Sequence, residues 1–185
     1  MYIKTAFFSS LLRVHDGGHN YVLGLRHCPD PNCAALLFFG FSDGQLTITF
    51  PAERIDFDST NVPTLVIAAF EEAITCHANQ CFIASAIMVR KTLELLCRDR
   101  GAEGDNRKER IAALGTKVVL PKELLDGLDD LRLLGNDAAH VESKEYDQVG
   151  KEEVEVGIEF TKEVLKAVYQ YSILLTRLRA LKKTT

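Results

Sequence analysis

Short apolar runs separated by turn residues fill the first sixty residues of the chain. The runs cover residues 21–25, 34–41 and 46–50, lengths typical of β-strands. Between them lie the turn clusters Asp16-Gly17-Gly18, Pro29-Asp30-Pro31-Asn32 and Ser42-Asp43-Gly44. We expect a small antiparallel meander of three or four strands. Such a sheet is marginal by itself and must pack an apolar face on something.

From residue 62 onward apolar positions recur every three or four residues, the period of an amphipathic helix. We predict helices over residues 62–76, 81–100, 107–114, 122–134 and 151–182. Asn61 can cap the first helix, and the polar cluster 77–80 marks a corner before the second. Gly101 and Gly115 are read as the stops of the second and third helices. At roughly 1.5 Å per residue the last helix would span more than about 40 Å, longer than a compact bundle of this size needs.

This pattern predicts an α+β fold that is mainly α. Residues 1–60 would form the small β-meander, packed on a helical bundle of residues 61–185. The chain of 185 residues is 46% hydrophobic and 26% charged, values ordinary for a soluble globular protein. Its apolar runs are too short to cross a bilayer and its beginning is a poor signal peptide, so we expect a cytoplasmic protein without membrane contact.

The charge balance argues against strong non-specific binding of nucleic acid. The formal net charge is −4, and no basic stripe of the kind that tracks a phosphate backbone is evident. The nearest candidate is the cationic end of the chain, with Arg177, Arg179, Lys182 and Lys183. Cations there also suit the negative end of a helix dipole, which is the simpler interpretation.

Five cysteines, an odd number, argue against a disulfide framework. Cys97 is expected to be a small buried hydrophobe, and Cys76 and Cys81 are also assigned to core packing. His77 and Cys81 stand one helical turn apart. They could supply metal ligands only if their helix packed against the turn at residues 27–33.

The stretch from Leu131 to His140 carries the most chemical information. Arg132, Asn136 and His140 follow one another at intervals of four, which places them on one face of a continuous helix. These side chains could bind an anion and support acid–base chemistry at a phosphodiester. They could equally form a buried polar network between helices. Arg90 and Glu94, also four apart, would then be supporting members of that network.

The helical half resembles the bacterial "domain of unknown function 4145" family, a branch of the HEPN superfamily of helical bundles. The resemblance is carried by residues 84–96, a small-residue helix with Arg90 before a Leu-Glu pair, and by Gly135-Asn136-Asp137-Ala138-Ala139-His140. It implies a metal-independent ribonuclease acting at a dimer interface. By position, Arg132 would stabilise phosphate charge, Asn136 would orient the phosphate and His140 would be the general acid or base.

The sequence departs from that pattern at two points. Seven residues rather than four to six separate Arg132 from His140, and the apolar Leu133 follows the arginine. We therefore expect a non-catalytic interaction or ligand-binding module of a bacterial system, in phage defence or restriction as the resemblance implies. The alternative is a metal-independent endoribonuclease of the HEPN type. A homodimer is expected under both, with RNA or another protein as the further partner.

Relatives of this family often begin with a zinc ribbon, and Cys28 and Cys33 resemble one surviving cysteine pair. A structural zinc needs four ligands. The candidates nearby are His15, His19 and His27. His15 and His19, however, lie at the far end of the predicted strand, roughly 15–20 Å away, a separation that one zinc cannot bridge. The expectation is a degenerate ribbon without metal or other cofactor, with a site at Cys28 and Cys33 as the weaker alternative.

Overall fold

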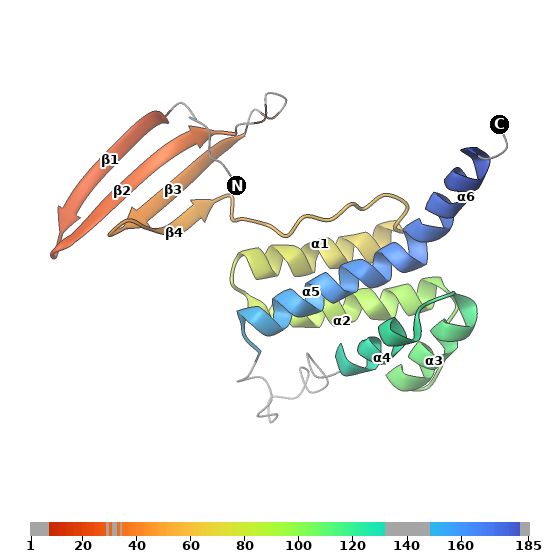
Figure 1. Ribbon diagram of the computed structural model, residues 1–185. Coiled ribbons are helices and arrows are strands. Elements are labelled where there is room, and N and C mark those ends of the chain that lie inside the picture. Colours follow the sequence, from red (N-terminus) through yellow and green to blue (C-terminus); the bar gives the residue numbers. More distant parts are fainter. Residues whose placement is uncertain (1–7, 29, 31–32, 34, 132–148, 182–185) are drawn as a thin grey trace. The chain divides into compact units, whose positions relative to one another are not determined.

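The computed structural model describes residues 8–28, 30, 33, 35–131 and 149–181. The chain forms two compact units, Met1–Glu53 and Arg54–Thr185. The first holds a four-stranded antiparallel sheet and the second a bundle of helices, as Figure 1 shows. The predicted fold class, α+β and mainly α, is confirmed.

The sheet is a meander in which each strand pairs with the next along the chain. Its strands are β1 (Phe8–Asp16), β2 (His19–His27), β3 (Leu36–Ser42) and β4 (Gln45–Phe50). The first and last hairpins close on two-residue turns, Gly17-Gly18 and Asp43-Gly44, and all four turn residues have positive φ. Such turns match the twist of the strands they join. Because the turns are short, they fix the register at Asp16 opposite His19 and Ser42 opposite Gln45.

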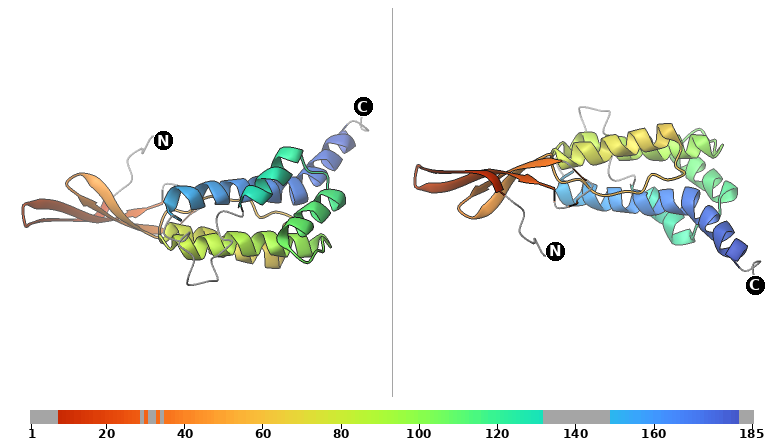
Figure 2. Two further views of the ribbon diagram at one scale, coloured as in Figure 1. Left: turned by 90° about the horizontal axis from the view of Figure 1, so that it is seen from below. Right: turned by 90° about the horizontal axis from the view of Figure 1, so that it is seen from above.

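The bundle is built on three long helices that contact one another in pairs (Figures 1 and 2). They are α1 (Thr64–Ala78), α2 (Phe82–Asp99) and α5 (Lys151–Leu165). The shorter α3 (Arg107–Lys117) and α4 (Lys122–Asp130) pack on each other, and α3 contacts α2. The chain continues from α5 through a π-helical segment, η3 (Lys166–Gln170), into α6 (Tyr171–Leu181).

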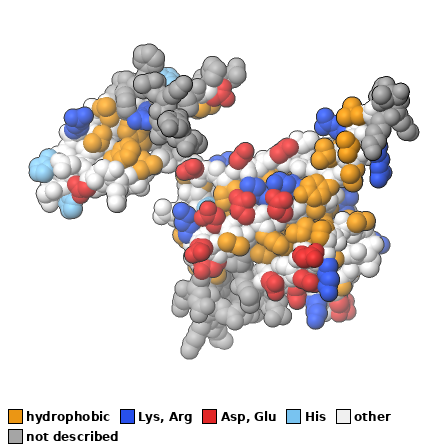
Figure 3. Space-filling view, viewed as in Figure 1, with side chains coloured by type: hydrophobic (Ala, Val, Ile, Leu, Met, Phe, Trp, Pro, Cys, Tyr) orange, Lys and Arg blue, Asp and Glu red, His pale blue; other side chains and the backbone are white. Residues whose placement is uncertain are grey.

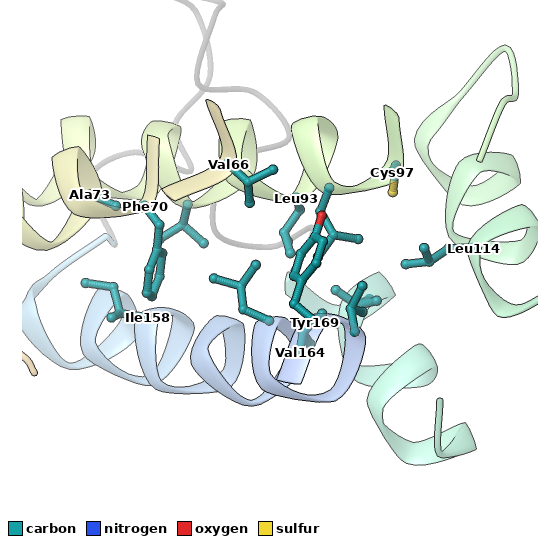
Figure 4. Packing of buried hydrophobic residues seen from close by; sticks show 14 of the residues in the cluster. Val66, Phe70, Ala73, Leu93, Cys97, Leu114, Ile158, Val164 and Tyr169 are labelled. Carbon is teal, nitrogen blue, oxygen red and sulfur yellow. The ribbon is translucent and has the colours of Figure 1, made fainter. Parts of the chain in front are cut away.

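The core lies where the inner faces of α1, α2 and α5 meet (Figure 4). Its fully buried side chains include Phe70 of α1, Leu96 of α2 and Ile158 of α5. Leu114 of α3 and Leu128 of α4 extend this cluster. Truncating such a core side chain to alanine typically costs about 2–5 kcal/mol, so this cluster anchors the bundle. Among the described helices, none has the length and apolar character of a membrane span.

Two residues that were predicted to begin or end a helix do not do so, for identifiable reasons. Asn61 does not cap α1: it has φ +66°, and Pro63 is the N-cap residue, without a side-chain bond. Gly115 does not end α3, which runs on to Lys117. A Cβ on Gly115 would lie 2.9 Å from the side chain of Leu125, so this glycine serves the close approach of α3 and α4.

Candidate functional site

The three residues proposed from the sequence to form a site lie outside the described residues. Arg132, Asn136 and His140 follow Leu131, the C-cap of α4, whose side chain packs against the helical core. Both interpretations of these residues, a polar network and a nuclease site, therefore stay predictions. The supporting pair on α2 is described.

Arg90 and Glu94 form an ion pair along one face of α2. The Arg90 Nε lies 3.1 Å from the Glu94 Oε1, and each side chain is 35% exposed. A pair this exposed is worth only a few tenths of a kcal/mol. Both charges retain contact with water, so burial alone demands no further partner for either.

A small cavity lies next to Glu94. It has a volume of about 10 Å³, close to that of a single water site. Glu94 and Arg110 are the charged residues of its wall, which is otherwise apolar and is formed by Leu93, Leu96, Cys97, Ile111, Leu114 and Leu128. A space of this size cannot hold a substrate, so it is a packing feature of α2, α3 and α4.

The second unit also has an open groove. It lies between α1 and the segment of residues 54–57 that precedes this helix. Its volume is about 290 Å³, and it is lined by Arg54, Ile55, Asp56, Phe57, Glu71 and Ile74. This is near the lower end of the range for small-molecule pockets. Its three charged side chains are exposed, so the groove lacks the enclosed polar groups that fix a ligand.

A polar contact that sequence patterns did not indicate joins α2 to η3. The hydroxyl of Tyr169 donates to the Asp99 Oδ2 at 2.9 Å, and the Tyr169 side chain is almost fully buried. The Arg100 guanidinium lies over the ring, 4.2 Å from its centre, and pairs with Asp99 at 3.2 Å. Burial raises the pKa of Tyr169, and the bond to Asp99 raises it further. The Tyr169 hydroxyl therefore stays a donor in a bond that joins α2 to η3.

A second contact holds η3 to the chain that precedes α1. The Gln170 side-chain amide donates to the carbonyl oxygens of Asp58, at 2.7 Å, and Thr60, at 3.1 Å. A π-helical turn inserts an extra residue and thereby shifts the faces of the helix that follows. Tyr169 and Gln170 fix the turn at the point where the long helix leaves the core.

His19 lies at one end of β2, and His27 lies at the other end, beside Cys28. At one end the His19 Nδ1 lies 2.6 Å from the Asp43 Oδ2. The pKa of Asp43 is lowered, mainly by the hydrogen bond that the Asn20 backbone N–H donates to its carboxylate and also by the contact with His19. Cys28 and Cys33 belong to the connection that follows the other end of β2. Within the described part of the chain, no group of three His, Cys, Asp or Glu side chains could hold a metal ion.

The most unusual surface of the bundle is α6. None of its residues is buried, although six are large and apolar. These six are Tyr171, Ile173, Leu174, Leu175, Leu178 and Leu181, with exposed fractions between 40% and 71%. Figure 3 shows hydrophobic side chains along this helix with Lys or Arg beside them. The predicted overhang of the closing helix is thus present, with an apolar surface.

The family model described as "Domain of unknown function (DUF4145)" matches residues 71–184. The chain belongs to this family. The DUF4145 match covers α1 from Glu71 together with all the following helices, and it confirms the family predicted from the sequence. No curated protein and no solved structure matches the chain.

Proposed function

We propose that this chain is a non-catalytic protein-interaction module that self-associates through α6. The observation that carries the proposal is the apolar surface of this helix, which has no buried residue. Scattered apolar side chains on a surface need no explanation, but a contiguous group marks a site of association. On α6 they are contiguous.

Five of the six apolar side chains fall on one stripe. Residues 171, 174, 175, 178 and 181 follow the spacing of a single helix face. On an ideal helix Arg177 and Arg179 flank this stripe, one on each side, and Ile173 lies on the opposite face. An apolar centre with a charged rim is the usual composition of a protein interface.

The charges along the closing helix favour a second copy of the chain as the occupant. The outer face of α5 begins with the exposed acidic residues Glu152 and Glu155, whereas α6 carries Arg177 and Arg179. If two copies pair antiparallel, the cationic end of one helix lies beside the acidic beginning of the other. Parallel pairing would oppose like charges, which is costly.

Molar mass in solution tests this proposal directly. By light scattering after size exclusion, the chain should have twice the protomer mass of 20.6 kDa. Leu174→Ser with Leu178→Ser should give monomers, because each buried leucine is worth about 1.5–3 kcal/mol and acts twice in a symmetric pair. We expect at least about a hundredfold weaker association. Ile173→Ser, at a side chain that is also exposed but lies off the stripe, is the matched control and should remain dimeric.

Charge reversal distinguishes a second copy from a different partner. Arg177→Glu with Arg179→Glu should weaken the dimer, most strongly at low salt. Adding Glu152→Arg and Glu155→Arg should restore the dimer. The charges at both ends of the closing helix are then reversed, so the two ends are again of opposite sign. A monomeric wild-type chain at high micromolar concentration would contradict self-association. Failure of the rescue would contradict the antiparallel arrangement.

The remaining parts of the proposal rest on the sequence resemblance. These are the HEPN-like character of the bundle, the degenerate zinc-ribbon origin of the sheet unit and a role in bacterial phage defence or restriction. The alternative activity, an endoribonuclease using Arg132, Asn136 and His140, also stays a prediction. Its test, cleavage of RNA in the presence of EDTA, is independent of the dimer test.

A further inference from the structure

The corner between α1 and α2 brings two cysteines together through its backbone geometry. The amide of Cys81 donates to the carbonyl of Cys76 at 2.8 Å, and the amide of Gln80 donates to that of His77 at 2.9 Å. Gln80 has φ +62°. Together these features form a Schellman motif, in which the side chains at the positions of Cys76 and Cys81 typically contact each other.

The two thiols have different environments. Cys81 was expected in the core but is exposed, because the motif turns it outward as the N-cap residue of α2. Its Sγ donates to the Asn79 carbonyl oxygen at 3.6 Å. Cys76 is partly buried. Burial raises the pKa of its thiol, and the nearby groups of Cys81 and Glu72 raise it further.

We propose that Cys76 and Cys81 form a dithiol modification site that a small-molecule disulfide, such as oxidised glutathione, converts to an intramolecular disulfide. The Cys81 thiolate attacks one glutathione sulfur, the glutathione S–S bond breaks and one glutathione thiolate leaves. Cys76 then gives up its proton and attacks the Cys81 sulfur, releasing the second glutathione. Two protein thiols are oxidised by two electrons, and one glutathione disulfide is reduced to two thiols.

A spacing of five residues does not by itself bring two cysteines together in this chain. Cys28 and Cys33 are also five residues apart, but their amides bond elsewhere, to Ala35 and Asp30 respectively. They lack the direct bond that joins Cys81 to Cys76. This pair therefore offers an internal comparison at identical spacing.

The test is oxidation of the folded chain with oxidised glutathione, followed by acid quenching, alkylation and peptide mass spectrometry. In wild type and in Cys28→Ser/Cys33→Ser, we expect Cys76 and Cys81 to become inaccessible to alkylation together. Mass spectrometry should show a disulfide between them within one peptide. In Cys76→Ser the glutathione adduct on Cys81 should persist. In Cys81→Ser, Cys76 should remain largely alkylatable. A glutathione adduct that persists on Cys81 in the wild type would overturn the proposal.

Two further readouts separate this site from unspecific oxidation. Closure should leave the far-ultraviolet circular dichroism of the helices unchanged, because the motif already places the residues together. It should also proceed in dilute protein without covalent dimers. Formation of the bond only under denaturing conditions, or crosslinks between molecules in its place, would show that the corner does not position the two thiols.

Discussion

Tyr169, inside the π-helical turn η3, donates its hydroxyl to the carboxylate of Asp99, seventy positions earlier at the end of α2. The bond joins the last turn of α2 to the segment where the closing helix leaves the core. Figure 4 shows the Tyr169 side chain extending from the closing helix toward α2. The Arg100 guanidinium covers the ring and pairs with the same oxygen of Asp99, Oδ2. The direction in which α6 leaves the bundle therefore depends on this contact.

Removing the hydroxyl should destabilise the bundle modestly. Tyr169→Phe keeps the buried ring but loses one hydrogen bond, and Asp99 is exposed enough to regain water as its partner. We expect a decrease of about 1 kcal/mol in the free energy of unfolding, measured with urea at unchanged slope. Tyr171→Phe, on an exposed tyrosine two residues later, is the control. Because Tyr171 lies on the proposed dimer stripe, both changes are compared in the monomeric Leu174→Ser/Leu178→Ser background, where Tyr171→Phe should have no effect. Equal effects of the two changes would refute the assigned role of the Asp99 contact.

The same tyrosine should make stability sensitive to alkaline pH. Burial and the Asp99 contact raise the pKa of Tyr169 in the folded state. Below about pH 10, the ordinary tyrosine pKa, the hydroxyl is protonated in both the folded and the unfolded chain. Its contribution to the free energy of unfolding is then fully present. As the pH rises above that value the unfolded chain loses the proton first, so the free energy of unfolding falls. In parallel urea titrations, the free energy of unfolding of Tyr169→Phe should fall less at alkaline pH than that of wild type. Identical losses would contradict this assignment.

The close contact of α1 and α2 depends on small side chains. Ala86 is 1% exposed, and the neighbouring Ser85 donates its hydroxyl to the Ala73 carbonyl of α1 at 2.7 Å. Ala86→Leu should overpack this contact and lower the unfolding free energy by about 1–3 kcal/mol. Ala84→Leu, on the exposed face of the same helix, should be nearly neutral because leucine is also a good helix former. Thermal unfolding of the two variants side by side checks the difference.

Local patterns predicted most of the fold because they reflect local physics. Short apolar runs bounded by the turn residues Gly17-Gly18 and Asp43-Gly44 predicted the hairpins, and a period of three to four residues predicted the helices. Cys97, predicted to be buried, is 6% exposed. The helix ends were less predictable, since Asn61 is excluded from capping by its backbone conformation.

The contacts between distant residues could not be predicted. Nothing in the spacing of Asp99 and Tyr169 indicates that they meet, because that depends on how α2 and α5 pack. The π-helical turn also could not be predicted from the spacing of apolar residues. A single added residue barely changes the apolar stripe of the closing helix, which continues on both sides of the turn. The exposure of Cys81 depends on the Schellman motif, which a left-handed Gln80 forms without the usual glycine. The signature residues Arg132, Asn136 and His140 lie outside the described residues, so their predicted roles stay predictions.

Cleavage of RNA separates an interaction module from an enzyme. We expect the purified wild-type chain to leave a pool of single-stranded and structured RNA intact in the presence of EDTA. A metal-independent ribonuclease would cut it, because an imidazole can move the 2′-hydroxyl proton without a metal ion. His140→Ala is the decisive comparison, provided that circular dichroism shows the variant to be folded. Cutting by wild type that disappears in this variant would replace our proposal with the nuclease alternative. Uncut RNA together with a marked loss of stability in His140→Ala would support the polar-network interpretation, and the dimer test on α6 would still stand by itself.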